Sequence, residues 1–253
     1  MSSGNSPFKF LDPFTKEDKE IFFGRDAEIE QLYEMVFESN LLLVYGESGT
    51  GKTSLVQCGL SSRFSDTDWL SILVRRGNRN INEVLMEELN KVARKPIPPE
   101  TPVPKAVESV YLDHFRPIYL VFDQFEELFV ADLGSTPTER NQFSRSIADL
   151  LAANQECTVI FVMREEYLAK LYEFESGNLP RIFNKRIRIE RMSPSNVEQV
   201  ITKTCARYNI ELEEPEQTVH KIIAKISGEQ AGIHLAYLQV YLDKLYQKAT
   251  EAS

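Results

Sequence analysis

The strongest chemical signal in this sequence is one nine-residue stretch, Gly46-Glu47-Ser48-Gly49-Thr50-Gly51-Lys52-Thr53-Ser54. Its first eight residues fit the pattern GxxxxGK[ST] in full, with an apolar, strand-like run before it and a helical pattern after it. In such a loop the glycines let backbone N–H groups point inward at a phosphate, and the following helix adds its own free N–H groups. We therefore expect Gly46–Ser54 to bind a nucleotide, with Lys52 bridging the β- and γ-phosphates and Thr53 binding Mg²⁺.

A second group of chemically capable residues follows the apolar run at 118–122. Asp123 comes directly after this run, and Glu126 and Glu127 follow three and four positions later. An apolar strand that ends in aspartate has the second metal-binding pattern of P-loop ATPases, and parallel sheets bind ligands at their carboxyl edge. We expect Asp123 to hold the Mg²⁺, directly or through water. Glu126 and Glu127 are candidates to polarise the attacking water; we favour Glu127, and a structural surface pair is the alternative.

Two further positions affect the expected chemistry. Many ATPases carry a glutamate directly after the metal-binding aspartate, but here that position is Gln124. A displaced base predicts slow hydrolysis. Arg164 follows the apolar run at 159–163, and we expect it to sense the γ-phosphate or to stabilise charge that develops during transfer. The alternative is an ion pair with Glu165 or Glu166.

Short apolar runs alternate with helical patterns as far as residue 190. Five runs predict strands: Leu41–Tyr45, Trp69–Val74, Ile118–Phe122, Val159–Met163 and Arg186–Glu190. Strands that alternate with helices predict βαβ units, so we expect an α/β P-loop NTPase fold with a parallel five-stranded sheet covered by helices on both faces. Thr136-Pro137-Thr138-Glu139 predicts the capped start of one of these helices.

The character of the sequence changes after Arg191. Three helical patterns follow, the first opened by Ser193-Pro194 and the last running from about 232 to 248, with no further strand signal. We expect a small all-helical subdomain resembling a lid. The expected organisation is a lead-in segment at 1–20, a P-loop nucleotide-binding domain at 21–191 and the helical subdomain at 192–253.

Composition narrows the range of partners. The chain has 253 residues, 38 of them acidic and 29 basic, and its formal net charge of -9 argues against nucleic acid as a partner. Three widely spaced cysteines without a CxxC pattern indicate a reducing compartment. No apolar run reaches the length of a membrane span and no signal peptide is visible, so we expect a cytoplasmic protein with no membrane partner. The guanine-reading motif [NT]KxD is absent, which favours ATP over GTP.

Together with the phosphate loop, three other stretches resemble one family. They are Ile21-Phe22-Phe23-Gly24-Arg25-Asp26-Ala27-Glu28-Ile29, the DQFEELF segment at 123–129, and Met163-Arg164-Glu165-Glu166-Tyr167-Leu168. The chain resembles the nucleotide-binding region of the prokaryotic novel STAND NTPases (signal transduction ATPases with numerous domains), over about residues 8 to 190.

This resemblance implies an ATP/ADP- and Mg²⁺-dependent switch within a larger regulator, with a role in prokaryotic defence. Phe23, Gly24 and Arg25 would lie against the adenine and ribose, and Arg164 would be the sensor. ADP would hold a closed monomer, whereas ATP would open the subdomains and permit homo-oligomerisation; the upstream protein ligand is not implied. The family's GxP turn reads Gly232-Ile233-His234 here, so no base contact is carried over. The alternatives are a non-hydrolysing nucleotide-dependent module and a nucleic-acid-remodelling ATPase.

Overall fold

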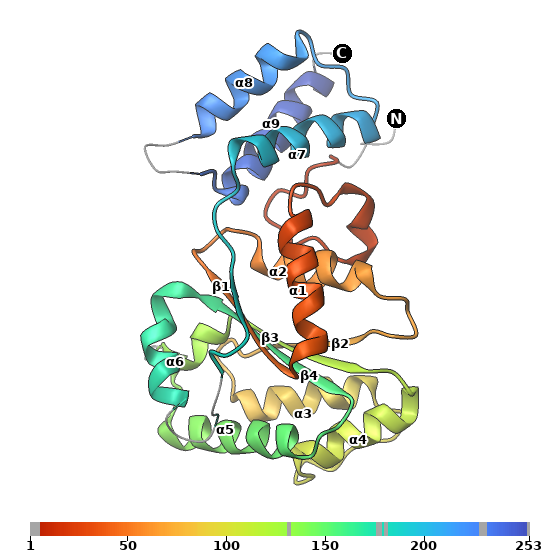
Figure 1. Ribbon diagram of the computed structural model, residues 1–253, viewed down its shortest axis with the longest axis vertical. Helices are drawn as coiled ribbons and strands as arrows, with labels where there is room; N and C mark the ends of the chain where they lie inside the picture. The colour runs from red at the N-terminus through yellow and green to blue at the C-terminus, as the bar shows by residue number, and fades with distance from the viewer. Residues whose placement is uncertain (1–5, 131–132, 176–178, 180–181, 228–231, 252–253) are drawn as a thin grey trace. The chain divides into compact units, whose positions relative to one another are not determined.

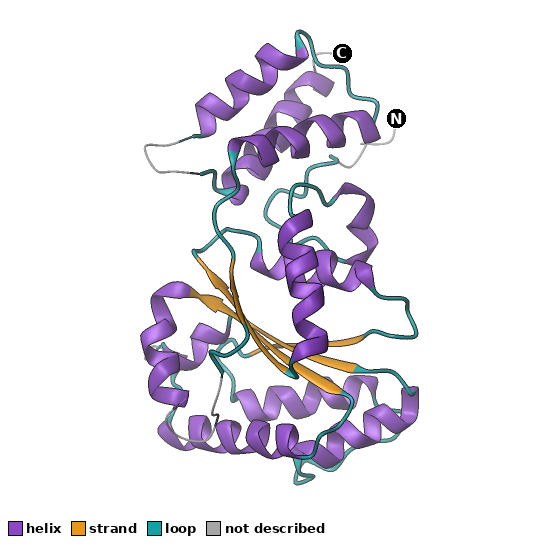
Figure 2. Ribbon diagram, in the orientation of Figure 1, coloured by secondary structure: helices purple, strands orange, loops and turns teal. Residues whose placement is uncertain are grey.

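The computed structural model describes residues 6–130, 133–175, 179, 182–227 and 232–251 (Figures 1 and 2). The chain divides into two compact units, each formed from segments distant in sequence. We call them the P-loop unit (Met1–Gln31, Glu47–Arg63 and Ile189–Ser253) and the sheet unit (Leu32–Gly46 and Phe64–Arg188).

The sheet unit contains a five-stranded sheet in the order β2-β3-β4-β1-β5, in which all neighbouring strands are parallel. The strands are β1 (Leu41–Gly46), β2 (Leu70–Arg75), β3 (Ile118–Asp123), β4 (Cys157–Arg164) and β5 (Arg186–Arg188). The predicted parallel five-stranded sheet is confirmed. Its last strand is shorter than expected, because pairing with β1 stops at Arg188.

The pairing register brings the carboxyl ends of four strands to one edge of the sheet. Gly46 of β1 pairs with Arg164 of β4, and Asp123 of β3 pairs with Val162 of β4. On the other side of β3, Asp123 lies opposite Arg75, the last residue of β2. The strand that leads into the phosphate loop and the strand that ends in Asp123 therefore finish at the same edge, separated by β4.

The described helices include short 3-10 segments (η) and one π-helix (η2). They are η1 (Lys16–Ile21), α1 (Asp26–Glu38), α2 (Lys52–Ser54), η2 (Leu55–Leu60), η3 (Ser61–Arg63), α3 (Ile81–Val92), α4 (Val103–His114), η4 (Phe125–Phe129), α5 (Pro137–Ala152), η6 (Glu165–Tyr167), α6 (Leu168–Glu175), α7 (Pro194–Arg207), α8 (Pro215–Ile226) and α9 (Leu235–Glu251).

Helices cover both faces of the sheet. Leu41 and Leu43 of β1 belong to the core that includes the apolar residues of α3, α4 and α5, which lie together on one side of the sheet (Figure 1). Because side chains alternate along a strand, Leu42 and Val44 point to the opposite face, on which the second half of α1 lies. The predicted α/β class is therefore confirmed.

The P-loop unit contains the helical region. Helices α7, α8 and α9 share an apolar core, which includes Val197, Ile201, Val219, Ile222, Leu238 and Leu242. As predicted, Ser193 caps α7: its side chain accepts a hydrogen bond from the N–H of Asn196 at 3.2 Å. An antiparallel bridge between Met192 and Ile233 joins the segment before α7 to the segment before α9. The third helix begins at Leu235, three residues later than expected, because the chain is extended at this bridge.

A buried ion pair fixes the start of α5 in the sheet unit. Thr136 caps this helix, accepting from the N–H of Glu139 at 3.1 Å. The Glu139 carboxylate accepts from Arg76 at 3.0 and 3.2 Å and from the N–H of Ile81 at 2.8 Å. Burial alone would raise the pKa of Glu139, but these hydrogen bonds and the charge of Arg76 together lower it.

Breaking this pair is expected to destabilise the fold. Glu139→Gln leaves the buried guanidinium of Arg76 without its counter-charge, and we expect a loss of about 3 kcal/mol in the free energy of unfolding at pH 7. Because the folded-state pKa of Glu139 lies below its ordinary value of 4.5, the pair stabilises the fold above that pH and its contribution disappears as the pH falls through the folded-state pKa. Urea unfolding at pH 7 and at pH 4 measures both effects.

The matched control for this prediction is Glu87→Gln. Glu87 pairs with Arg79 at an exposed position of α3, where both side chains are about half accessible to solvent. Exposed pairs contribute little to stability, so this variant should unfold as the wild type does. Equal unfolding curves for the two variants would contradict the structural role given to Glu139.

Candidate nucleotide-binding site

The phosphate loop follows β1 and leads directly into α2. Gly49 and Gly51 have φ angles of +74° and +88°, in the left-handed region that favours glycine. The loop curls around one carbonyl group: the Glu47 oxygen accepts from Lys52 Nζ at 2.6 Å and from Thr50 Oγ1 at 3.0 Å. Turns with left-handed residues are typical of anion-binding nests, in which successive backbone N–H groups point at one anion.

The segment that resembles the family's N-terminal motif packs against the loop and the helix after it. Gly59 of η2 lies so close to this segment that an added Cβ would come within 2.8 Å of Ile29 and 3.0 Å of Phe22. A π-helix directly after a phosphate loop is unusual, and such segments are frequent at functional sites. Close packing of Ile29 and Phe22 on Gly59 therefore positions η2, the helical segment that follows the phosphate loop.

Arg25 supports the loop from its backbone side. Its guanidinium is buried, donates to the carbonyl oxygens of Thr50 at 2.9 Å and Glu190 at 2.8 Å, and forms an ion pair with Glu28. Lys203 Nζ lies 5.7 Å from the ring centroid of Phe23. Phe23 and Arg25 belong to the same unit as the phosphate loop. Arg25 contacts the loop through the backbone carbonyl of Thr50.

Gly24 explains the close approach of this segment to α7. Its φ is +78°, and a Cβ at this position would come within 2.9 Å of the carbonyl oxygen of Asn196 and 3.1 Å of Val200. A side chain there would push the segment away from the first helix of the helical region. The family resemblance places Gly24 beside the nucleotide. In the structure, Gly24 allows the segment to pack closely against α7.

Arg191, which directly precedes the helical region, and His234 within it contact the phosphate loop, although no sequence motif assigns them to the site. Arg191 donates to the Glu47 carboxylate, with Nε and NH2 at 2.8 and 2.6 Å from Oε2. His234 lies against Gly49, because a Cβ on this glycine would be 2.6 Å from its Nδ1. The sequence signal for His234 was its place in the Gly232-Ile233-His234 turn, whereas Arg191 lies in none of the motifs.

In the sheet unit, Asp123 is held by a neighbouring strand. Its buried carboxylate accepts from Arg75, with Nε and NH2 at 2.9 and 2.7 Å from Oδ2. This pairing follows from the register, which places the two residues opposite each other. Arg75 was missed in the sequence, where it appears only as the residue after a predicted strand.

The two candidate glutamates differ in their surroundings. Glu126 is buried and accepts from Arg164 twice, with Oε1 3.1 Å from Nε and Oε2 3.1 Å from the backbone N. Glu127 is half-buried, and its Oε2 accepts from the N–H of Gly77 at 2.9 Å. Gln124 is exposed and has a left-handed backbone with φ of 57°. The structure therefore pairs Arg164 with Glu126.

The alternative pairing of Arg164 with the next residues along the chain is not what the structure shows. Glu165 accepts instead from Arg188 of β5, at 2.8 and 3.1 Å. Arg164 is thus directed toward the carboxyl edge of the sheet by Glu126, and about half of its side chain is exposed to solvent.

The donor atoms fit the expected Mg²⁺. Thr53 and Asp123 supply a hydroxyl and a carboxylate oxygen, which are hard ligands of the kind Mg²⁺ prefers. Asp123 is buried at the carboxyl edge, where its Oδ2 already accepts from Arg75, so the fit rests on the type of donor atom alone. Over the part of the chain that the structure describes, no three His, Cys, Asp or Glu side chains cluster as a metal site. Mg²⁺ suits such a chain, because it takes one or two protein ligands together with substrate phosphates.

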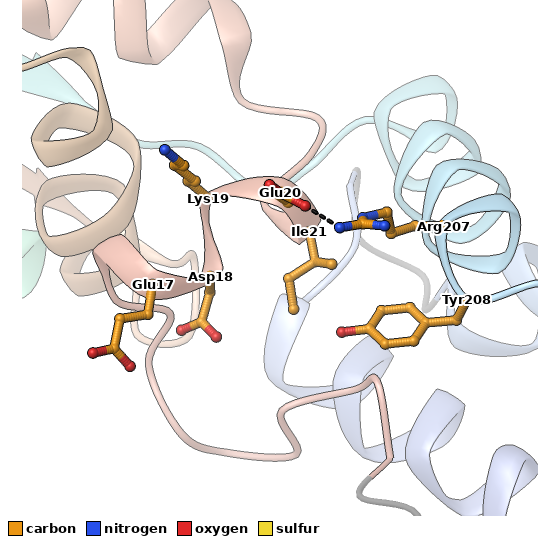
Figure 3. Close-up of a pocket in the computed structure, with 7 residues that line it drawn as sticks. All are labelled: Glu17, Asp18, Lys19, Glu20, Ile21, Arg207 and Tyr208. Atoms are coloured by element: carbon orange, nitrogen blue, oxygen red, sulfur yellow. Dashed lines mark hydrogen bonds and ion pairs between the residues drawn. The ribbon is translucent and has the colours of Figure 1, made fainter.

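A pocket of about 390 Å³ lies in the P-loop unit, between η1 and the C-terminal end of α7 (Figure 3). It is lined by Glu17, Asp18, Lys19, Glu20, Ile21, Arg207 and Tyr208. Glu20 forms an ion pair with Arg207, and Asp18 pairs with Lys9 at 2.7 Å. None of the lining residues is among those expected to bind nucleotide, so we assign this pocket no part in the site.

The described helices include none that is long and apolar enough to cross a membrane. Cys58, Cys157 and Cys205 are all buried and not in disulfides. Burial raises the pKa of Cys58 and of Cys157 to about 12, so both thiols stay protonated and unreactive at neutral pH.

Comparison with known proteins identifies both a family and a fold. The family described as novel STAND NTPase 1 matches residues 7–253. A search of curated proteins found no match. Among solved structures, the Walker-type ATPase paby2304 of Pyrococcus abyssi is similar with a TM-score of 0.70 and 15% identity, over 94% of this chain and 71% of that one.

The ORC2 and ORC1 proteins of Aeropyrum pernix have the same fold. ORC2, in ADPNP–ADP complexes, gives a TM-score of 0.65 at 14% identity, and this chain covers 64% of its length. ORC1, in complex with DNA, gives 0.57 at 15% identity, and this chain covers 62% of its length. The alignments include 90% of the present chain in both cases. At these identities the likeness is one of fold.

Proposed function

Since the chain belongs to the novel STAND NTPase 1 family, we propose that it is an ATP-binding, slowly hydrolysing switch and the nucleotide-binding core of a multidomain regulator. ADP holds a closed monomer in this proposal. ATP opens the helical region and permits association with further copies of the chain.

The observation that carries the proposal is the pair of contacts that the phosphate loop makes with the residues beside the Met192–Ile233 bridge. Arg191 and His234 flank the antiparallel bridge that joins the segments before α7 and α9, and both contact the loop, at Glu47 and Gly49. A ligand that enters the loop must meet these contacts. A ligand can drive a switch only if it binds one of the protein's two conformations more tightly than the other.

Roles for the site residues follow from their chemistry. Gly46–Ser54 cradles the phosphates, with Lys52 on the β- and γ-phosphates. Thr53 and Asp123 hold Mg²⁺, which neutralises charge on the phosphates when it is bound. Phe23, Gly24 and Arg25 form the adenine and ribose side, and Arg164 senses the γ-phosphate.

The contrast between the two glutamates supports Glu127 as the general base. A base must reach an attacking water with an available oxygen. Both oxygens of Glu126 accept hydrogen bonds from Arg164, whereas Glu127 is half-buried and one of its oxygens accepts from the N–H of Gly77. Gln124, at the position next to the metal-binding aspartate, cannot act as a base. This displacement supports slow turnover.

Two alternatives remain distinct from the switch. A non-hydrolysing nucleotide-dependent module is favoured by Gln124 and by the ion pair that engages Glu126. A nucleic-acid-remodelling ATPase is suggested by the likeness to ORC1, whose structure contains DNA. The net charge of -9 weighs against it, and fluorescence anisotropy with labelled duplex DNA at low salt decides the matter.

The switch is tested by measuring molar mass with each nucleotide. Light scattering coupled to size exclusion should give a monomer in Mg-ADP and at least a doubled mass in Mg²⁺ with a non-hydrolysable ATP analogue. The same mass in both nucleotides, with binding of both verified by calorimetry, would refute the switch and favour the non-switching module.

A further inference from the structure

His234 lies against the phosphate loop, where its ring can contact a bound phosphate chain. It directly precedes α9, and the bridge between Ile233 and Met192 fixes its backbone. A Cβ built on Gly49 would lie 2.6 Å from Nδ1 and 2.8 Å from Cε1 of the ring. The imidazole therefore rests on the glycine in the middle of the loop, with a ring nitrogen toward it.

The groups around this ring come from three segments. The phosphate loop contributes Glu47 and the loop's helix contributes Lys52, while the segment before α7 contributes Arg191. The ring of Tyr237, on α9, lies 5.3 Å from the His234 ring between centroids. Burial lowers the pKa of His234 below 6.5, and Arg191 and Lys52 lower it further, while Glu47 opposes them. With these neighbours the imidazole is neutral at pH 7.

A bound nucleotide would change the charge around the His234 ring from positive to negative. Its phosphates bring several negative charges to the loop, beside Lys52, whose own charge they then neutralise. An anion near an imidazole favours the protonated ring, because attraction to the charge offsets burial. A protonated ring also donates from both nitrogens, which suits a phosphate oxygen.

We propose that His234 is a phosphate-reading residue of this site: neutral on Gly49 when the loop is empty, and protonated and facing the phosphate chain when a nucleotide is bound. The proposal rests on nucleotide binding by the loop, and it adds a residue of the helical region to the phosphate-binding groups. Since the bound state holds one more proton, binding takes up a proton, and affinity rises as the pH falls from 8 to 6.

Three histidines make the test direct. His114, His220 and His234 are the histidines of the chain, so a sample labelled at histidine gives three ring signals. We expect the titration midpoint of His234 to move upward by about one pH unit on addition of Mg-ADP. The ring signals of His220 and of His114, which bonds the carbonyl of Val92 at 2.7 Å, serve as the internal reference.

Calorimetry with variants supplies the second readout. Mg-ADP should bind the wild type several-fold more tightly at pH 6 than at pH 8, with a factor of about ten as the limit that one unit of pKa sets. His234→Gln should lose most of this dependence, and what is left belongs to the nucleotide itself. His220→Gln, on α8, is the matched control and should behave as the wild type.

The outcomes separate this inference from the function on which it rests. Binding of Mg-ADP with an unmoved His234 signal, or with equal pH dependence in wild type and His234→Gln, overturns the phosphate-reading role and leaves nucleotide binding intact. Failure of the wild type to bind Mg-ADP at any pH overturns nucleotide binding itself.

Discussion

Lys52→Ala should weaken binding of ATP and ADP by about 100-fold or more. The ammonium group is expected to contact two phosphates, and each charge-assisted hydrogen bond contributes about 1.5–3 kcal/mol, with about 1.4 kcal/mol corresponding to a factor of ten. In the structure this group already lies inside the loop, 2.6 Å from the Glu47 carbonyl oxygen. Isothermal titration calorimetry with Mg²⁺ and each nucleotide measures the loss.

Two controls separate this effect from general damage. Lys105→Ala removes a lysine from an exposed ion pair with Glu108 on α4 and should leave affinity unchanged. A thermal unfolding curve of Lys52→Ala without nucleotide verifies that the variant is folded, since Lys52 Nζ donates to the carbonyl oxygen of Glu47 within the loop. Unchanged affinity in a folded Lys52→Ala protein would mean that the loop is not the phosphate site.

Glu127→Gln should lower the rate of ATP hydrolysis by about 10²–10⁴-fold while leaving nucleotide affinity close to that of the wild type. A general base contributes a factor of this size, and the amide cannot take the proton. Single-turnover release of labelled phosphate measures the rate, and calorimetry with a non-hydrolysable analogue measures binding in the same preparation.

Glu126→Gln is the informative comparison. It removes the charge that directs Arg164, whose side chain is half exposed, so we expect lower stability and weaker discrimination between ATP and ADP, with most of the turnover kept. If Glu126→Gln abolishes turnover while Glu127→Gln does not, the base is Glu126 and our assignment is wrong.

The sheet and the helical region could be predicted because their signals are local. An apolar run such as Ile118–Phe122 is too short and too β-branched for a helix, and Ser193-Pro194 is a start signal that the structure uses as written. Strand order and strand ends depend on pairing. Cys157 joins β4 because it pairs with Ile118, and Glu190 lies outside β5 because pairing with β1 ends at Arg188.

In the site, too, local features could be predicted from the sequence and long-range contacts could not. Gly49 and Gly51 were identified by spacing, and their left-handed backbone gives the reason for glycine. The ion pairs Arg75–Asp123 and Arg191–Glu47 join residues 48 and 144 positions apart, which no spacing rule reaches. His234 was visible only as a departure from a turn motif, and its contact with Gly49 comes from the tertiary fold.

Binding and turnover of ATP by the purified chain in Mg²⁺ test the central claim most directly. We predict saturable, Mg²⁺-dependent binding of ATP and of ADP, with slow release of phosphate from ATP. Tight binding without any phosphate release would move the chain to the non-hydrolysing class. No binding of either nucleotide at concentrations that saturate other P-loop proteins would contradict the account.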